Sequence, residues 1–553
     1  MNKFTFFSLK NFATFLSKSK ILLILIIMLA AAVRVVALDK FPNGFTGDEA
    51  QQGYSAYSIL KTGQDEWGQF LPLNPRGFGD FKPPFYTYLT IPAVAIFDLN
   101  ITAVRLPAAL IGILTVLIVY FLTKELLSRE DTALWAAFLL SISPWHIQLS
   151  RTAFEGGVGI LTFSLGLLFF LKSKEKKYLI LTIILWGLTF YTYHSFRVLI
   201  VLFVLGLFFL CRLSKKQIVY LGLGLFIFLI PLLINFGNIS ARASDVGIFS
   251  NEQITGYFKY KGTSPLSPGI DKIFDNKFLF IKNNFQENYL SYFSSTFFFT
   301  GARPDNTYLN FPGFGLLYVV EIIFWLFAIK EIFFKKLINK EIIIWWFLIA
   351  PVGAALATGG LNANRAPTFL PLTAIISAIG IVSLVDFLRN KFANLPWVRI
   401  LTAILLVYFI FFLYFYFIKL SQHPINNVRF GYETIFEKVL SVKTQYSQIV
   451  ISSRLTEPQI FVAFYGKIDP QFFQTSSTDW LRYERSNKLY VDQLESWNLD
   501  NFYFEGIDWL KKDSLRKNAL IVSEPEDFPE DIKSLLDVKN PAGKIIYRIV
   551  PTK

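Results

Sequence analysis

The stretch VRLPAALIGILTVLIVYFLTKEL, residues 104–126, has no charged residue between Arg105 and Lys124. An apolar run of this length is typical of an α-helix that crosses the roughly 30 Å hydrocarbon core of a membrane. Similar runs recur along the 553 residues, of which 53% are hydrophobic and 17% charged. Soluble proteins carry about 25% charged residues. The sequence therefore predicts a polytopic α-helical membrane protein.

The apolar runs predict about eleven transmembrane helices. The predicted spans are 21–38, 103–122, 132–149, 157–171, 178–194, 197–211, 218–236, 312–329, 342–358, 368–385 and 400–419. The first segment, residues 1–20, carries four lysines, and further basic loops follow at every second connection. Because Lys and Arg accumulate in cytoplasmic loops, we expect a multi-pass protein of the cell (plasma or inner) membrane with its N-terminus in the cytoplasm.

This loop pattern also accounts for the net charge of +14. The basic residues are spread over short loops rather than gathered on one face of a soluble domain, so the charge orients the protein and does not indicate a nucleic-acid partner. The single cysteine, Cys211, excludes an intramolecular disulfide and a Cys-based metal site. With three histidines in the chain, a His-rich metal centre is also disfavoured.

Three large segments fall on the extracytoplasmic side of this topology. Residues 39–102 combine a polar loop with an apolar, Pro-broken helix expected in the membrane interface, and residues 237–311 predict short surface helices. Residues 421–553 follow the membrane domain, 21–420, and predict a small extracytoplasmic α/β domain. Its expected elements are a helix at 435–446 and strands at 448–453, 460–466, 519–524 and 544–550.

Two adjacent carboxylates, Asp48 and Glu49, stand in TGDEAQQGY, residues 46–54, just after the first span. Thr and Asp favour a helix start, and acids in a first turn suit the helix dipole. The alternative is a general base held at the membrane face, where it activates a hydroxyl. Both interpretations can hold for the same pair, because a side chain at a helix start is rigidly aimed.

A lysine followed by two prolines stands in GDFKPPFY, residues 79–86. The prolines fix the backbone where the chain enters the interface. Lys82 either extends its ammonium group towards the lipid head groups or is a fixed cation suited to a phosphate. The local sequence leaves these two alternatives open.

Further ionisable residues stand at the outer ends of the predicted spans, where a charge near hydrocarbon is costly. They are Arg105, Arg151, Glu155, His194, Arg197, Arg303 and Arg365. Taken singly, the arginines can be surface anchors, Glu155 a helix-start acid, and His194 with Arg197 a structural corner on one helix face. Taken together, outward cations beside two acidic positions indicate an anionic substrate group that meets a base.

The order of GDEA, KPPFY and VRLPAALIGILTVLIVYFLTKEL resembles the bacterial branch of the GT-C glycosyltransferases. Specifically, it is similar to the family 39 protein O-mannosyltransferase-like enzymes and their relatives that transfer aminoarabinose to lipid A. The resemblance covers roughly residues 21–370 and implies a sugar donor linked to a polyprenyl phosphate. It also implies that Asp48 is the base, that Lys82 holds the carrier phosphate, and that Arg105 is the family's arginine at the start of the second span.

One position departs from the aminoarabinose-transferring relatives. Those enzymes carry an acid directly before the Lys-Pro motif, where this chain has Phe81, with Asp80 one residue earlier. The requirement for a divalent metal therefore stays open.

The resulting hypothesis is a glycosyltransferase, a hexosyl- or pentosyltransferase, with its active site on the extracytoplasmic side. It would move a sugar from a polyprenyl-phosphate donor to a hydroxyl of a protein, lipid or glycan acceptor. The expected catalytic carboxylates are Asp48, Glu49 and Glu155. The expected donor-phosphate ligands are Lys82, Arg105, Arg151 and Arg365, and the expected pocket residues are His194, Arg197 and Arg303.

Two other functions were weighed against this one. A transporter or flippase of lipid-linked sugars needs a hydrophilic path across the bilayer, and the mostly apolar spans argue against it. A non-catalytic assembly protein that binds through its C-terminal domain would leave GDEA and KPPFY unexplained.

Overall fold

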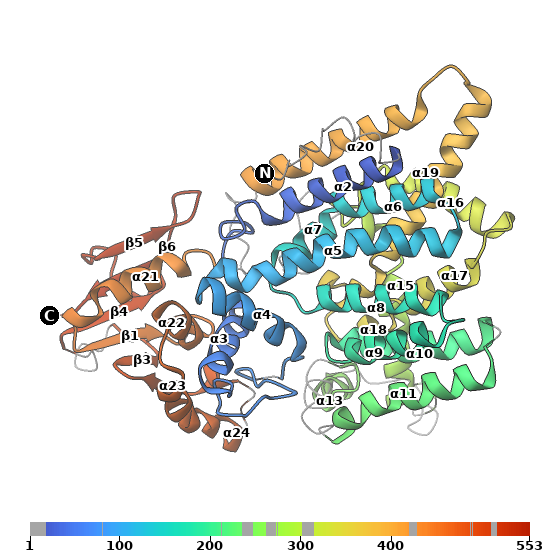
Figure 1. The fold of residues 1–553 in the computed structure, drawn as a ribbon. Coiled ribbons are helices and arrows are strands. Elements are labelled where there is room, and N and C mark those ends of the chain that lie inside the picture. The colour runs from blue at the N-terminus through green and yellow to red at the C-terminus, as the bar shows by residue number, and fades with distance from the viewer. Residues whose placement is uncertain are drawn as a thin grey trace, which may run out of the picture.

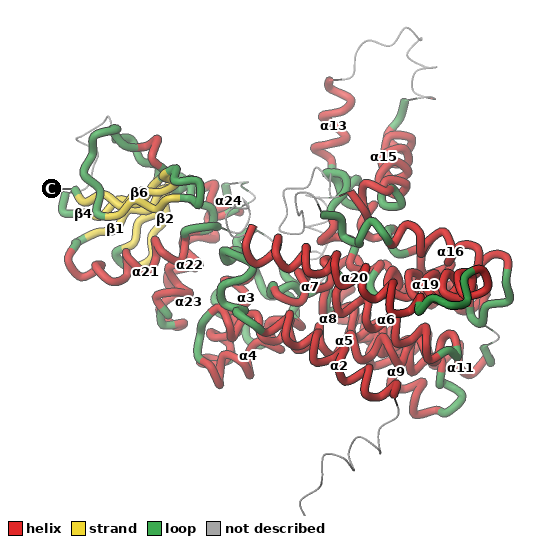
Figure 2. The backbone as a smooth tube through the Cα atoms, turned by 90° about the horizontal axis from the view of Figure 1, so that it is seen from above, coloured by secondary structure: helices red, strands yellow, loops and turns green. Residues whose placement is uncertain are grey.

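The computed structural model describes residues 18–79, 81–211, 213–234, 247–260, 273, 275–300, 314–419, 429–486, 488, 490–509 and 517–552. It is mostly helical with a small C-terminal sheet, as predicted. Figure 1 shows the body of long helices beside the smaller C-terminal part, with α3 (Gly47–Thr62) and α4 (Phe85–Phe97) between them. The view from above shows the same division, with the yellow strands confined to the C-terminal part (Figure 2).

The helical body consists of apolar helices joined mostly by short loops. They are α2 (Lys18–Val35), α5 (Ile101–Leu127), α6 (Glu130–Ile142), α7 (Pro144–Arg151), α8 (Gly156–Leu171), α9 (Lys176–Thr189), α10 (His194–Leu210), α11 (Lys215–Ile234), α16 (Glu321–Phe334), α17 (Lys340–Ile349), α18 (Val352–Ala355), α19 (Leu372–Lys391) and α20 (Trp397–Tyr414). Helices α13 (Asn251–Tyr260) and α15 (Lys277–Ser291) lie between α11 and α16 in the sequence.

Each predicted span overlaps a helix, but the count of about eleven transmembrane helices is not confirmed. Among the described helices, four are long and apolar enough to cross a membrane, or five if the bent pair α7 and α8 forms one span. Several predicted spans correspond to helices that are too short to cross a membrane. Helix α9 has 14 residues and α17 has 10, which at 1.5 Å per residue gives about 21 and 15 Å.

Helix α5 lies at the centre of this body and packs against α2, α4, α6, α7 and α8. The close approach of α7 depends on Gly112, because a Cβ atom there would overlap the Ser150 side chain. On the opposite side α19, buried along most of its length, packs on α16. In contrast, Ile234 of α11 and Phe411 of α20 are largely exposed, as expected for helices that face lipid.

The C-terminal part contains a six-stranded mixed sheet in the order β2-β3-β1-β4-β6-β5. The strands are β1 (Gln448–Ser452), β2 (Ser496–Leu499), β3 (Phe502–Glu505), β4 (Ala519–Ser523), β5 (Leu536–Lys539) and β6 (Ile545–Pro551). Strand β1 pairs in parallel with β3 and β4, and the remaining pairs are antiparallel. The central strands are almost completely buried, which agrees with their apolar sequences.

One of the elements predicted for this part is wrong. The strand expected at 460–466 is helix α22 (Pro458–Gly466). Its residues from Pro458 to Phe464 are all buried. The run therefore lacks the hydrophobic periodicity that distinguishes a helix from a strand. Pro458, however, stands at the first position of the helix, which proline favours. The other expected elements are confirmed as α21 (Tyr432–Val442), β1, β4 and β6.

The C-terminal part packs directly on helix α3. The Tyr54 hydroxyl donates a hydrogen bond to the Ile468 carbonyl at 2.8 Å, and Gly53 lies against the Phe464 ring. One cluster of buried apolar side chains extends from the first outer segment to residues 432–549. The position of α3 therefore depends on both parts of the chain.

Two adjacent carboxyl groups, Asp65 and Glu66, are fully buried beside this contact. Gln474 of the C-terminal part donates to the Asp65 carbonyl at 2.9 Å. Ser55 and Gln51 donate to the Glu66 carboxylate at 2.6 and 3.3 Å. Burial, together with the neighbouring Asp65 carboxylate, raises the pKa of Glu66 to about 8.

The raised pKa predicts that the protein loses stability as the pH rises from about 5 to 8. Folded Glu66 keeps its proton in this window, whereas the unfolded chain releases it near its ordinary pKa, so the free energy of unfolding falls with rising pH. Glu66→Gln should flatten this decline in thermal unfolding measured between pH 5 and 9. The exposed Glu530→Gln serves as the control, and an equal decline in wild type and Glu66→Gln would contradict the prediction.

Candidate active site

Helix α3 begins with a capping box that fixes the backbone around Asp48. Thr46 Oγ1 accepts a hydrogen bond from the Glu49 amide at 3.1 Å, and Glu49 Oε2 accepts one from the Thr46 amide at 3.0 Å. This reciprocal arrangement satisfies two backbone donors at the helix start. The predicted helix start is confirmed, and Asp48 lies in its first turn.

The Glu49 carboxylate also binds the Arg105 guanidinium of α5. Nε and Nη2 of Arg105 donate to Glu49 at 2.8 and 3.2 Å, and the Ala153 amide donates to Glu49 Oε1 at 3.1 Å. The other Arg105 hydrogen bonds go to the carbonyls of Leu38, Pro42 and Gly44, at 3.1, 3.1 and 2.6 Å.

These contacts bear on the roles expected for Arg105 and Glu49. A guanidinium has five N–H donors, and the five hydrogen bonds of Arg105 use all of them within the protein. The Arg105 and Glu49 side chains are 0% and 3% exposed. In this arrangement all five donors of Arg105 bind groups of the protein, and Glu49, which also lines the pocket, is held in a buried ion pair.

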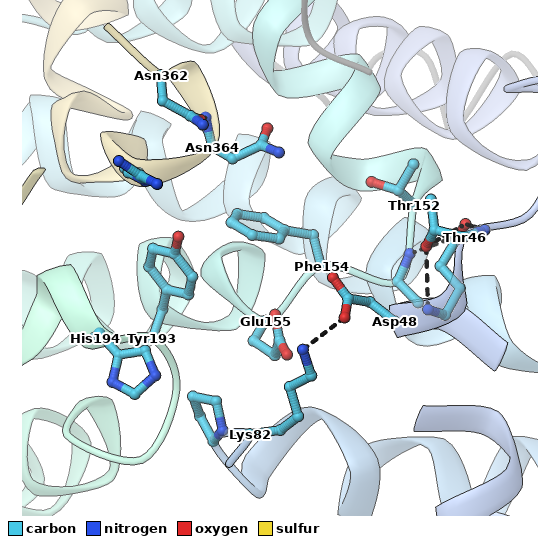
Figure 3. A pocket seen from close by; sticks show the side chains of 14 residues that line it. Thr46, Asp48, Lys82, Thr152, Phe154, Glu155, Tyr193, His194, Asn362 and Asn364 are labelled. Carbon is cyan, nitrogen blue, oxygen red and sulfur yellow. Dashed lines mark hydrogen bonds and ion pairs between the residues drawn. The ribbon is translucent and has the colours of Figure 1, made fainter. Parts of the chain in front are cut away.

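Asp48 points away from this ion pair into a pocket. Its side chain is 63% exposed, and its Oδ1 lies 2.6 Å from Nζ of Lys82, whose side chain is 10% exposed. Figure 3 shows the Lys82 ammonium group directed at Asp48, with the Glu155 carboxylate beside it. Of the two alternatives for Lys82, the structure therefore favours the fixed cation over one that extends to lipid head groups.

The pocket has a volume of about 190 Å³ and is built from segments far apart in the sequence. It is lined by Thr46, Asp48, Glu49, Lys82, Pro83, Thr152, Ala153, Phe154, Glu155, Tyr193, His194, Asn362, Asn364 and Arg365. The structure thus brings together six of the predicted site residues, namely Asp48, Glu49, Lys82, Glu155, His194 and Arg365.

Glu155 reaches the pocket because the chain bends sharply before α8. Helices α7 and α8 are bent by 115° at the intervening residues 152–155. Gln52 of α3 donates to Glu155 Oε1 at 2.9 Å and to the Ala153 carbonyl at 3.1 Å, which ties this bend to the helix that carries Asp48. Among the described residues, no group of three or more His, Cys, Asp and Glu side chains could hold a metal ion.

His194 and Arg197 lie on one face of α10, as predicted, but only His194 lines the pocket. Nη1 of Arg197 lies 3.1 Å from Nδ1 of His194, and its Nε donates to the Phe190 carbonyl at 2.9 Å. Arg197 instead borders an apolar groove between α10 and α11. The His194–Arg197 contact therefore connects the pocket to this groove.

Arg151, predicted as a phosphate ligand, is a buried structural residue. Its guanidinium donates to the carbonyls of Val33, Val36, Ala37 and Phe41 at 2.6 to 3.0 Å. It also lies over the rings of Tyr416 and Phe417. Arg151 thus fixes the end of α2 against α7 and does not line the pocket. Arg303 lies outside the described residues.

The sequence reasoning missed the polar residues on the far side of the pocket. Asn362 and Asn364 stand around the turn Ala363–Arg365, where Asn362 Oδ1 accepts from the Asn364 amide at 2.9 Å. The buried Asn364 Oδ1 has no hydrogen-bond partner among the described residues. The signal was available in GGLNANR, residues 359–365, because amides beside a glycine pair suit ligand binding.

The geometry predicts opposite effects for two arginines. Arg105→Gln should lower the free energy of unfolding by about 3–5 kcal/mol, because it leaves the buried Glu49 carboxylate unpaired. Arg365→Gln, at the pocket edge, should leave unfolding nearly unchanged but weaken the binding of a polyprenyl phosphate. Thermal unfolding and ligand titration in detergent measure both effects. A stable Arg105→Gln variant with lost phosphate binding would restore Arg105 as a ligand.

Part of this chain is similar in sequence to a known protein family. Residues 81–234 match the family described as dolichyl-phosphate-mannose-protein mannosyltransferase. A search of curated proteins found no match.

Among solved structures, the chain is similar to apo ArnT from Cupriavidus metallidurans, with a TM-score of 0.51 and 13% identity over 96% of this chain and 98% of ArnT. The structure of C. metallidurans ArnT bound to undecaprenyl phosphate has a TM-score of 0.50 and 13% identity, over 95% of this chain and 97% of ArnT. The oligosaccharyltransferase AglB from Archaeoglobus fulgidus has a TM-score of 0.48 and 14% identity, over 81% of this chain and 63% of AglB. The chain is thus similar over residues 81–234 to this mannosyltransferase family, and it shares the fold of ArnT along nearly its whole length.

Proposed function

We propose that this protein transfers a sugar from a polyprenyl-phosphate donor to an acceptor hydroxyl on the extracytoplasmic side of the membrane. The observation that carries the proposal is the contact between Asp48 and Lys82, 2.6 Å apart in the pocket. The exposed Asp48 carboxylate can act as a general base. The ammonium group of Lys82, whose side chain is mostly buried, can bind the anionic leaving group beside it. Sugar transfer from a phosphate carrier needs both in one place.

The reaction is a displacement at the anomeric carbon of the donor sugar. Asp48 takes the proton of the acceptor hydroxyl while the acceptor oxygen forms the new bond to the anomeric carbon. The bond between that carbon and the phosphate oxygen breaks, and its electron pair leaves with the polyprenyl phosphate. The departing polyprenyl phosphate is a stable anion that needs no proton to leave. Fixed cations can therefore replace a general acid.

Three basic side chains of the pocket suit the departing phosphate. Lys82 is within reach of Asp48, and His194 and Arg365 line the same pocket. Lys82 forms an ion pair with Asp48 in this structure. A donor phosphate would compete with Asp48 for the Lys82 ammonium group.

The apolar groove beside Arg197 suits the polyprenyl chain of this donor. It has a volume of about 370 Å³ and is lined by Phe190, Arg197, Val198, Val201, Leu202, Leu229, Leu232 and Leu233. Burial of apolar surface stabilises a lipid tail by about 25 cal/mol per Å². The Arg197–His194 contact lies between this groove and the pocket, where the phosphate of such a donor would be held.

The sugar would lie between Asp48 and the Asn362–Asn364 side of the pocket. Asn364 Oδ1 is a buried acceptor that a sugar hydroxyl can satisfy. The family description names a dolichyl-phosphate-mannose donor, and the ArnT structure contains undecaprenyl phosphate. Both are polyprenyl-phosphate compounds, which supports the same class of donor here. Glu155, held by Gln52 beside the pocket, would orient the acceptor hydroxyl.

Asp48→Asn should reduce sugar transfer by about 100- to 10,000-fold, because an amide cannot take the hydroxyl proton. Donor affinity should stay close to that of wild type. The measurement is transfer in proteoliposomes loaded with undecaprenyl-phosphate-mannose, together with a donor titration. Asp131→Asn is the matched control, since Asp131 is also an exposed first-turn acid paired with a cation, at 2.8 Å from Arg129. Unchanged transfer by Asp48→Asn would refute the base assignment.

Lys82→Met should instead weaken donor binding by about 1.5–3 kcal/mol, the contribution of a charged hydrogen bond. This corresponds to roughly 10- to 150-fold in the dissociation constant. Lys124→Met, which removes an exposed ion pair with Glu130, serves as the control. A donor affinity equal to that of wild type would reassign Lys82 to holding Asp48 alone.

A further inference from the structure

A second cavity, of about 460 Å³, lies where the first outer loop meets the C-terminal part. It is larger than the pocket that contains Asp48. Its lining comes from Asp39, Lys40, Asn43, Gly44, Phe45, Ile101, Arg429, Phe430, Gly431, Glu433, Thr434, Tyr465, Leu536, Asp537, Val538 and Lys539. Neither the family motifs nor the sugar-transfer mechanism uses this cavity.

The lining of this interdomain cavity is polar and carries no net formal charge. Three acids, Asp39, Glu433 and Asp537, are balanced by three basic residues, Lys40, Arg429 and Lys539. A phosphate or nucleotide would need an excess of cations, and a lipid tail would need an apolar lining. The charge balance therefore indicates a neutral ligand with many hydrogen-bonding groups.

The Tyr465 hydroxyl is an unsatisfied group in this cavity. It is buried and has no hydrogen-bond partner among the described residues, although the Tyr465 side chain lines the cavity. Its ring is held by stacking on Phe461 and Phe436 and by an edge contact with Phe464. A buried hydroxyl without a partner is costly, and a ligand hydroxyl would supply the missing partner.

The cavity and the active pocket share one short piece of chain. Gly44 and Phe45 line the cavity, whereas Thr46 lines the active pocket. Two residues span at most about 7 Å of extended chain, so the two hollows lie close together. Arg105 fixes this shared wall. It donates a hydrogen bond to the Gly44 carbonyl at 2.6 Å and lies over the Phe45 ring.

We propose that the interdomain cavity binds neutral sugar residues of the acceptor, so that the acceptor is a glycan. This inference rests on the sugar transfer proposed for the neighbouring pocket. Sugar hydroxyls both donate and accept hydrogen bonds, which matches a lining that offers three carboxylates, three cations and one phenol. Phe430, which is only partly buried, adds apolar surface to this lining for the C–H face of a sugar ring.

The test is binding of neutral trisaccharides to the full-length protein in nanodiscs without donor. Mannotriose, cellotriose and chitotriose are titrated, and binding is followed by saturation-transfer difference NMR. Tyr465→Phe should weaken the trisaccharide that binds by about 3- to 10-fold, the effect of one lost hydrogen bond. Its melting temperature should not fall, because the hydroxyl has no hydrogen-bond partner to lose among the described residues.

Tyr446→Phe removes a hydroxyl from the same part of the chain but outside the cavity, and should bind as wild type does. Glu433→Gln, on the cavity wall, gives a second variant that should also weaken binding. Absence of binding by all three sugars, or equal affinity of wild type, Tyr465→Phe and Glu433→Gln, would overturn the proposal.

The same experiment separates this inference from the proposed function. Asp48→Asn should bind the trisaccharide with wild-type affinity while it fails to transfer sugar from undecaprenyl-phosphate-mannose. If wild type transfers sugar to a peptide or lipid hydroxyl but binds no trisaccharide, the transfer mechanism stands and the glycan acceptor is refuted. If trisaccharides bind and Asp48→Asn still transfers, the cavity stands and the role of Asp48 is refuted.

Discussion

The buried ion pair of Arg105 with Glu49 connects three segments of the chain beside the pocket. Through Glu49 it reaches the start of α3 and the Ala153 amide, and through Arg105 it reaches the carbonyls of residues 38–44. Such a pair contributes little net stability when intact but is costly to break. Its effect here is geometric: with Glu49 turned inward, the preceding residue of the helix, Asp48, is turned towards the pocket.

Buried cations recur in this protein as organisers of backbone. Arg151 collects four carbonyls around the end of α2, and Arg34 of the same helix donates to the carbonyls of Leu140 and Ser141. Carbonyls at a helix end lack partners within the helix, so an arginine can satisfy several at once. Several of the charged residues near the helix ends therefore bind backbone carbonyls and do not line the pocket.

This division explains how far the sequence could predict the site. Motif order identified Asp48 and Lys82, and span ends identified Glu155, His194 and Arg365, all of which line the pocket. An arginine at a span end gives no sign of whether it faces a ligand or backbone carbonyls, so the sequence could not predict that Arg105 and Arg151 bind carbonyls. Asn362 and Asn364 were missed because uncharged amides in a loop carry no strong pattern. The helical class and three of the six strands, β1, β4 and β6, were predictable, but the apolar run 460–466 lacked the periodicity that decides its type.

The packing of α3 has a consequence for biosynthesis. Tyr54 and its partner Ile468 are separated by 414 residues, and the apolar cluster around α3 includes side chains as late as Ile549. At 5–20 residues per second, the partners of this helix leave the ribosome roughly 20–80 s after it does. The surface of α3 stays uncovered during that interval, so the helix that carries Asp48 reaches its final packing late. A nascent chain arrested before residue 432 would therefore contain all residues of the pocket but lack the C-terminal packing on α3.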